Sequence, residues 1–224
     1  MTTNSQFDAI FDFDGVLADS APLIVEILER LLCHDLGLKI TTEQLRATVG
    51  PPFRQAVEEL CSLTKTSLNA PHVDDIVQAF RAEYAMRVVS ETPMFPGVLE
   101  ALSLMHEDFR LTICSSKPRP LIDAMLVSWG IDDLFAAVEA PPLGSTETKT
   151  EGLARLLLDL NMRTDNCALI GDTVYDATAA NANGVPLVAV SWGIGDPDEL
   201  HAAGAVDVVH HPSELAAAIA GLST

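Results

Sequence analysis

Short apolar runs of strand length alternate with helical patterns along most of this 224-residue chain. The runs occupy residues 7–13, 110–115, 135–139, 167–171 and 186–190. The segment VDVVHH at 206–211 predicts a final strand, and Gly130 and Gly184 are typical of helix C-termini. Parallel strands need long crossover connections, so strands separated by helices indicate a parallel sheet with helices on both faces. We therefore predict an α/β fold built on one parallel sheet.

Residues 19–92 interrupt this alternation with a block of helical patterns. Ser20 is a candidate N-cap, and the apolar residues after it follow helical spacing at positions 23, 24, 27, 28, 31 and 32. Later segments also favour helices without an intervening strand pattern, at 41–50, 51–60 and 72–89. We predict a core of residues 1–18 and 93–224, with a helical unit of residues 19–92 inserted after the first strand.

The composition excludes some classes of function. The chain has 13 Lys and Arg against 32 Asp and Glu, a formal charge of −19, which repels nucleic acid and anionic membranes. An anionic substrate would therefore need a local positive site built from few cations. No apolar segment approaches the ~20 residues that cross a bilayer, and MTTNSQ does not resemble a signal peptide. The four cysteines lie far apart in the sequence, and no close pair resembles a metal motif or a redox centre, so we expect reduced thiols. We expect a cytoplasmic protein, monomeric or homodimeric, that binds neither nucleic acid nor membranes.

Two carboxylates lie at the end of the first apolar run, in the segment FDFDGVLADS. On a strand, residues two apart share a face, so Asp12 and Asp14 would lie on one side, roughly 6 to 7 Å apart. The two charges repel each other, and burying either one without a partner is costly. The pair therefore needs a compensating partner.

Other polar groups follow the later apolar runs. In open parallel sheets, ligands bind at the carboxyl ends of the strands. Ser115 and Ser116 follow the second run, where a hydroxyl could hold a phosphate oxygen or cap the next helix. Lys149 precedes the helical run LARLLLDL and opposes the helix dipole there. It could neutralise a phosphoryl group, or it could be a solvated surface lysine.

The segment LIGDTVYD supplies the last group. Asp172 directly follows the run at 167–171, and Asp176 follows four residues later, so a helix would place both carboxylates on one face. The alternative is an Asp N-cap followed by an ordinary acidic first turn. Taken together, four consecutive strand ends with such groups favour one site. Up to four carboxylates in one crevice need a hard cation, and oxygen ligands with room for water suit Mg²⁺.

These motifs, in this order, resemble those of the haloacid dehalogenase superfamily. The segments SKP at 116–118, NANGVP at 181–186 and SWGIGDPDELHAAGA at 191–205 are similar to its phosphoglycolate phosphatase-like branch. The resemblance implies a Rossmann-like core with a helical cap domain inserted after the first motif.

The resemblance also implies roles for the acidic residues. Asp12 would be the nucleophile that forms an aspartyl-phosphate. Asp14 would protonate the departing oxygen and later activate water, while its backbone carbonyl binds Mg²⁺. Asp172 would bind the metal together with Asp12, and Asp176 would orient metal-bound water.

Further residues would hold the substrate. Ser115, more than its neighbour Ser116, and Lys149 would bind the phosphoryl oxygens, together with backbone N–H groups after Asp12 such as that of Gly15. In this pattern Lys117 belongs to the serine motif and is not the phosphate lysine. Arg54, in VGPPFRQA, would contact the distal part of the substrate, or it is a solvated helix residue.

The implied enzyme is a Mg²⁺-dependent phosphatase of a small phosphorylated metabolite, with phosphoglycolate and nucleoside monophosphates the foremost substrates. A sugar-phosphate mutase on the same scaffold is one alternative, because it uses the same pair of aspartates. A phosphate-accepting signalling module, like a response-regulator receiver, is another, although receivers lack a helical insertion after the first strand.

Overall fold

The computed structural model describes residues 6–50, 53–64 and 70–222 of the chain. Expectations for the first five residues and for Pro51 and Pro52 lie outside this part. The chain divides into two compact units, one of Met1–Asp19 with Met94–Thr224 and the other of Ser20–Pro93. In the described ranges, no helix has both the length and the apolar character that crossing a membrane requires.

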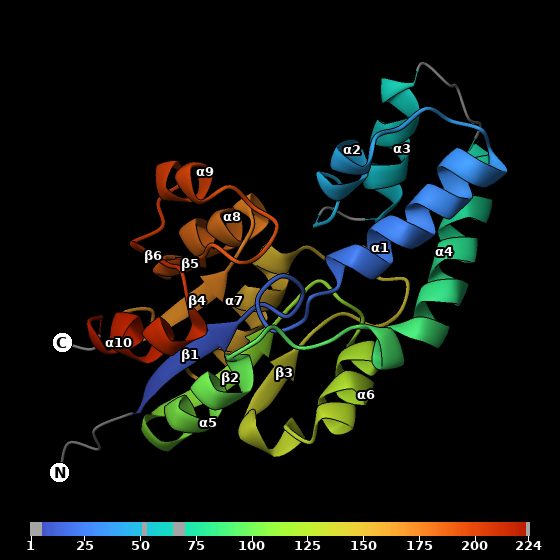
Figure 1. The fold of residues 1–224 in the computed structure, drawn as a ribbon. Coiled ribbons are helices and arrows are strands. Elements are labelled where there is room, and N and C mark those ends of the chain that lie inside the picture. Colours follow the sequence, from blue (N-terminus) through green and yellow to red (C-terminus); the bar gives the residue numbers. More distant parts are fainter. Residues whose placement is uncertain (1–5, 51–52, 65–69, 223–224) are drawn as a thin grey trace, which may run out of the picture. The chain divides into compact units, whose positions relative to one another are not determined.

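The first unit is built on a six-stranded parallel sheet (Figure 1). Its strands are β1 (Phe7–Phe11), β2 (Phe109–Cys114), β3 (Ala137–Glu139), β4 (Cys167–Gly171), β5 (Leu187–Val190) and β6 (Asp207–Val209). The order is β3-β2-β1-β4-β5-β6, so the direction of winding reverses between β1 and β4. The predicted α/β fold with a parallel sheet is confirmed.

Helices cover both faces of this sheet. They are α5 (Val98–Asp108), α6 (Arg119–Trp129), α7 (Lys149–Asp159), α8 (Val174–Asn183), α9 (Pro197–Ala202) and α10 (Leu215–Ala220). Helices α7, α8 and α9 bury side chains such as Leu153, Ala177 and Leu200 against one face, which presents Ile10 and Leu169. Helices α5 and α10 pack together and contact β2 and β6. Glycines in the left-handed conformation, Gly130 and Gly184, end α6 and α8 as predicted.

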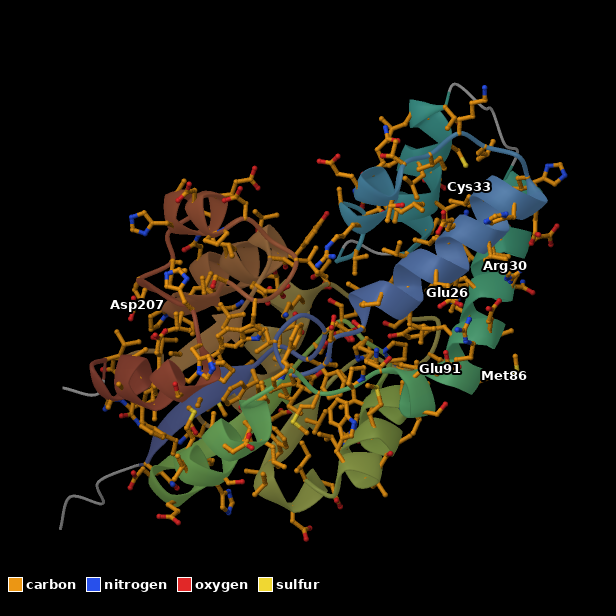
Figure 2. All side chains as sticks on the ribbon, viewed as in Figure 1. Glu26, Arg30, Cys33, Met86, Glu91 and Asp207 are labelled. Atoms are coloured by element: carbon orange, nitrogen blue, oxygen red, sulfur yellow. The ribbon has the colours of Figure 1, made fainter. Side chains whose placement is uncertain are left out.

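The second unit is helical. It contains α1 (Ala21–Leu28), which continues as a π-helix (Glu29–Asp35), α2 (Thr42–Arg46), α3 (Phe53–Leu63) and α4 (Ala70–Glu91). Ion pairs join the first and last of these helical segments, between Arg87 and Glu26 at 2.8 Å and between Arg30 and Glu83. Glu26 and Arg30 are labelled in Figure 2. Ser20 occupies the N-cap position of α1, as predicted. Its dihedrals are helical, however, and its buried hydroxyl makes no capping bond.

Candidate active site

The carboxyl ends of β1 and β4 lie side by side where the winding reverses, which is where open parallel sheets bind ligands. Asp12 follows β1, and its N–H donates to the carbonyl of Ile170 in β4 at 2.9 Å. Asp172 follows β4 directly. The expectation from sequence that these two carboxylates belong to one end of the sheet therefore agrees with the fold.

Asp14 does not continue the strand. Strand β1 ends at Phe11, and Gly15, at φ +81°, turns the chain so that its N–H donates to the carbonyl of Ala18 at 2.9 Å. Strand alternation therefore does not set the direction of the Asp14 side chain, and the predicted shared strand face is wrong. A side chain at Gly15 would collide with Asp172, since its Cβ would lie 2.1 Å from an Asp172 oxygen.

Three buried carboxylates form the centre of the site. Asp12, Asp172 and Asp176 each offer an oxygen, and these oxygens lie within 4.8 Å of one another. Burial raises the pKa of Asp12 to about 6, with Asp176 adding to the effect and Lys149 opposing it. Burial also raises the pKa of Asp172, and the charges of Asp176 and Asp12 raise it further. Such a cluster is unfavourable when fully ionised unless a cation joins it.

The oxygens of Asp172 show where a cation would fit. Its Oδ2 accepts a hydrogen bond from the backbone N–H of Ile194 at 2.8 Å. Its Oδ1 is buried and has no hydrogen-bond partner among the described groups. A buried, unpartnered carboxylate oxygen beside two further carboxylates is a ligand set that suits a hard divalent cation such as Mg²⁺.

Asp176 holds the start of α8 as well as facing the cluster. Its Oδ2 accepts from the N–H groups of Asp172 and Thr173, at 3.2 and 2.9 Å, and from the Thr173 hydroxyl at 2.8 Å. The N-cap of α8 is thus Thr173 and not Asp172. Asp176 is an acidic residue in the first turn of α8 and also belongs to the carboxylate cluster, so its position agrees with both interpretations of the sequence.

Lys149 brings the balancing charge. Its buried Nζ lies 2.7 Å from Asp12 Oδ2 and forms a second ion pair with Asp176. Burial disfavours the ammonium, but the charges of Asp12 and Asp176 outweigh this and raise the pKa of Lys149. The lysine therefore stays protonated, and these two ion pairs offset its unfavourable place at a helix N-terminus.

Lys149 lies at the start of a helix, as its place before LARLLLDL predicted, and not at a strand end. It is the first residue of α7, and β3 ends ten residues earlier, at Glu139. A capping box between Thr148 and Glu151 fixes this first turn. The rule that ligands bind at the carboxyl ends of parallel strands therefore accounts for Asp12, Asp172 and Ser115. Lys149, in contrast, reaches the cluster from a helix.

Ser115 and Ser116 follow β2. Ser115 is buried and its Oγ accepts a hydrogen bond from the Lys117 N–H at 3.3 Å, whereas Ser116 is exposed. Both serines line one small pocket together with Lys149. Neither caps α6, whose N-cap position is Pro118, so that alternative is wrong.

A glycine-containing loop after β5, Ser191–Gly195, covers Asp172. Besides the Ile194 bond, the indole Nε1 of Trp192 donates to the carbonyl of Val16 at 3.1 Å, in the turn after Asp14. A Cβ at Gly193 would lie 2.3 Å from Asp172 Oδ2, so the close approach needs a glycine. The two glycines of the segment SWGIG are the sequence signal for this close approach, and no role at the site was predicted for them.

The family follows from comparison with known proteins. The model of the haloacid dehalogenase-like hydrolase family matches residues 9–190, most of the chain. The chain belongs to this family. The resemblance that its motifs indicated is therefore confirmed.

Relatives of this hydrolase include proteins named as phosphatases. It is 31% identical to the phosphoglycolate phosphatase of Caulobacter vibrioides, over 89% of this chain and 85% of the relative. It is 28% identical to a 5'-nucleotidase of Pseudomonas aeruginosa, over 95% of this chain and 92% of the relative. A solved structure described as a predicted phosphatase from Clostridium acetobutylicum superposes with a TM-score of 0.85 at 26% identity, covering 96% of this chain and 99% of the other.

Lys117 and Arg54 form ion pairs in different units of the hydrolase. Lys117, which the sequence analysis set aside, is buried and pairs with Asp14 in the first unit. The sequence could have indicated a role for Lys117, because it is one of only four lysines in a chain of charge −19 and closely follows a strand end. Arg54 lies in α3 of the second unit, where its exposed guanidinium pairs with Asp74 and with Glu58. Its contact with a substrate stays a prediction.

Proposed function

We propose that this hydrolase is a Mg²⁺-dependent phosphatase that forms an aspartyl-phosphate on Asp12. The observation that carries the proposal is the buried ion pair of Lys149 with Asp12, at 2.7 Å, beside the unpartnered Oδ1 of Asp172. A buried cation next to a carboxylate nucleophile can neutralise an incoming phosphoryl group. The phosphoglycolate phosphatase and 5'-nucleotidase names of its relatives support a phosphoric monoester hydrolase.

The first step uses Asp12 and Asp14. A carboxylate oxygen of Asp12 attacks phosphorus, the bond from phosphorus to the ester oxygen breaks, and Asp14 gives its proton to that oxygen. In the second step Asp14 takes a proton from water, whose oxygen attacks the phosphoryl group on Asp12. Inorganic phosphate leaves, and both carboxyl groups return to their initial states.

The remaining residues bind and orient. Lys149 and Ser115 hold the phosphoryl oxygens, with Ser116 and the N–H of Gly15 as further donors. Asp12, Asp172 and the carbonyl of Asp14 would hold the metal. Asp176 would orient a water molecule bound to that metal. When bound, Mg²⁺ supplies positive charge that stabilises the phosphoryl oxygens in the transition state. The rest of the stabilisation comes from these positioned side chains.

The substrate is a small phosphorylated metabolite. Phosphoglycolate and nucleoside monophosphates are the first candidates, because the relatives are named for phosphoglycolate and nucleotides. Arg54 would contact the part of the substrate beyond the phosphate. We further propose a cytoplasmic monomer or homodimer, since all four cysteines carry free thiols.

A screen of phosphate release tests this proposal. The purified protein is assayed against a panel of phosphorylated metabolites, with Mg²⁺ and with a chelator, and reactions are also analysed for isomerised substrate. We expect Mg²⁺-dependent phosphate release that Asp12→Asn abolishes. An isomer without phosphate would indicate a mutase instead, and unchanged release by Asp12→Asn would disprove the mechanism.

A further inference from the structure

Lys117 contacts the side chain to which the proposed reaction assigns proton transfer. Its Nζ lies 2.9 Å from one carboxylate oxygen of Asp14 and 3.2 Å from the other. The lysine side chain is 2% exposed, whereas that of Asp14 is 26% exposed. The pair thus has a buried cationic end and a carboxylate that reaches toward solvent.

We propose that Lys117 is a positioning residue that fixes the Asp14 carboxylate for proton transfer to the leaving group. The inference rests on the proposed phosphatase function. Asp14 lies in the turn after β1, where its backbone forms a single bridge with Ala18 and belongs to no strand. A cation that contacts both oxygens restrains the rotation of the carboxylate, which a contact to one oxygen would leave free. Proton transfer requires that orientation, because a general acid must lie within hydrogen-bond reach of the departing oxygen.

Lys117 is itself held on several sides. Its N–H donates to the Oγ of Ser115 at 3.3 Å, just after β2. Its Nζ lies 5.7 Å from the ring centroid of Phe13, a cation–π distance. The Phe13 ring stacks in turn on Trp129 of α6, with centroids 5.5 Å apart and planes 10° from parallel. The backbone of Lys117 is therefore held after β2, and its ammonium lies beside Asp14 and the Phe13 ring, which both follow β1.

This arrangement joins two parts of the proposed reaction. The backbone of Lys117 touches Ser115, which would hold the phosphoryl group, and its ammonium touches Asp14, which would serve the leaving group. In the first step the phosphorus–oxygen bond to the leaving group breaks, the bond from Asp12 to phosphorus forms, and the proton of Asp14 moves to the departing oxygen. Within this first step, only that proton transfer depends on where Asp14 points.

The dependence on the leaving group therefore tests the role of Lys117. An alkoxide leaves slowly without a proton, whereas nitrophenolate leaves readily without one. For Lys117→Met with saturating Mg²⁺, we expect the rate of leaving-group release in the first turnover to fall about 100-fold on an alkyl phosphate such as phosphoglycolate or glycerol phosphate, within the usual range for general acid catalysis. On p-nitrophenyl phosphate we expect this first-turnover rate to change only about threefold or less, with KM little altered on either substrate. Lys117→Arg should recover part of the lost rate.

The matched control is Lys39→Met, the same change at an exposed lysine of the second unit, which should alter neither substrate. A double-mutant comparison tests whether Lys117 acts through Asp14. In the first turnover, Asp14→Asn should show the same leaving-group pattern, and adding Lys117→Met to it should cost little more, because the lysine acts through Asp14. Melting temperatures identify any variant that misfolds, and Lys117→Gln then replaces Lys117→Met.

Several outcomes would overturn the inference. Equal losses on both substrates, a matched rise in KM, or additive effects with Asp14→Asn would show that Lys117 binds substrate or acts independently of Asp14. If the wild-type protein releases phosphate and Asp12→Asn does not, while Lys117→Met loses nothing, the proposed function stands and the inference fails. If the wild-type protein releases phosphate from neither substrate, the proposed function itself fails.

Discussion

At the scale of single residues, the site is organised around buried charges that do not balance by themselves. Asp12, Asp172 and Asp176 surround one point, and Lys149 offsets only part of their charge. Burial raises the pKa of Asp12 to about 6 and also raises that of Asp172. The metal-free site therefore favours protons where a cation would otherwise bind.

The stability of the metal-free protein should depend on pH in a definite direction. A carboxyl whose folded pKa is raised binds its proton more tightly when folded, so its contribution is greatest at low pH. For Asp12 that contribution is lost as the pH rises from about 4 to about 6. In chelator, we expect the melting temperature to fall across this window. Added Mg²⁺ should raise it strongly at pH 7.5 and weakly at pH 5, where protons compete.

Asp172→Asn supplies the variant for the same thermal measurement. Removing one buried negative charge should raise the metal-free melting temperature at pH 7.5, because the repulsion within the cluster falls. It should also remove most of the Mg²⁺-induced shift, because a ligand is lost. A full Mg²⁺ shift in Asp172→Asn would contradict the assignment of Asp172 as a ligand.

At the scale of elements, the first turns of α7 and α8 bring Lys149 and Asp176 together. The capping box of Thr148 and Glu151 starts α7, and Asn183 of α8 donates to the carbonyl of Thr150 at 3.1 Å. The position of Lys149 thus depends on how α7 begins and on its contact with α8.

Thr148→Ala should therefore affect both stability and binding. Loss of an N-cap costs about 1 kcal/mol, and a loosened first turn should raise KM for the phosphorylated substrate several-fold. Urea unfolding and steady-state kinetics measure the two effects. Thr41→Ala is the matched control, because Thr41 forms the same kind of capping box on α2 in the second unit. Equal KM values for the two variants would argue against this role of the α7 cap.

The same elements show how far the sequence could predict the site. Apolar runs located the strands, and because parallel strands end at one edge, Asp12, Ser115 and Asp172 could be assigned to one site. The sequence also placed Lys149 at the start of a helix, but its ion pairs with Asp12 and Asp176 could not be predicted, since no pattern in the residues between β3 and α7 determines their path. The partnership of Lys117 with Asp14 spans 103 positions and depends on the turn at Gly15. Strand alternation gave the wrong geometry for Asp14 for the same reason.

At the scale of the whole molecule, the chain combines a parallel-sheet unit that contains the carboxylates with a helical unit that has its own core. The helical unit supplies the predicted substrate contact, Arg54. Its ion pairs with Asp74 and Glu58 are exposed, and exposed pairs contribute little to stability.

Arg54→Ala should change substrate preference more than stability. We expect a KM rise of about tenfold for the best metabolite of the screen, since a lost contact of about 1.4 kcal/mol has this effect. The KM for p-nitrophenyl phosphate should not change, and neither should the melting temperature. Arg163→Ala, which removes a similarly exposed guanidinium of the first unit, serves as the control. Identical kinetics in the two variants would remove Arg54 from the substrate site.

The central claim is that Asp12 carries the phosphoryl group during turnover. Asp14→Asn should slow hydrolysis of the acyl phosphate more than its formation from p-nitrophenyl phosphate, so the intermediate should accumulate. Denaturing this variant within the first turnover and reducing it with borohydride converts an aspartyl-phosphate to homoserine, which peptide mass spectrometry locates. We predict homoserine at residue 12 alone. Homoserine at another aspartate, or none while nitrophenol appears in a burst, would contradict the account.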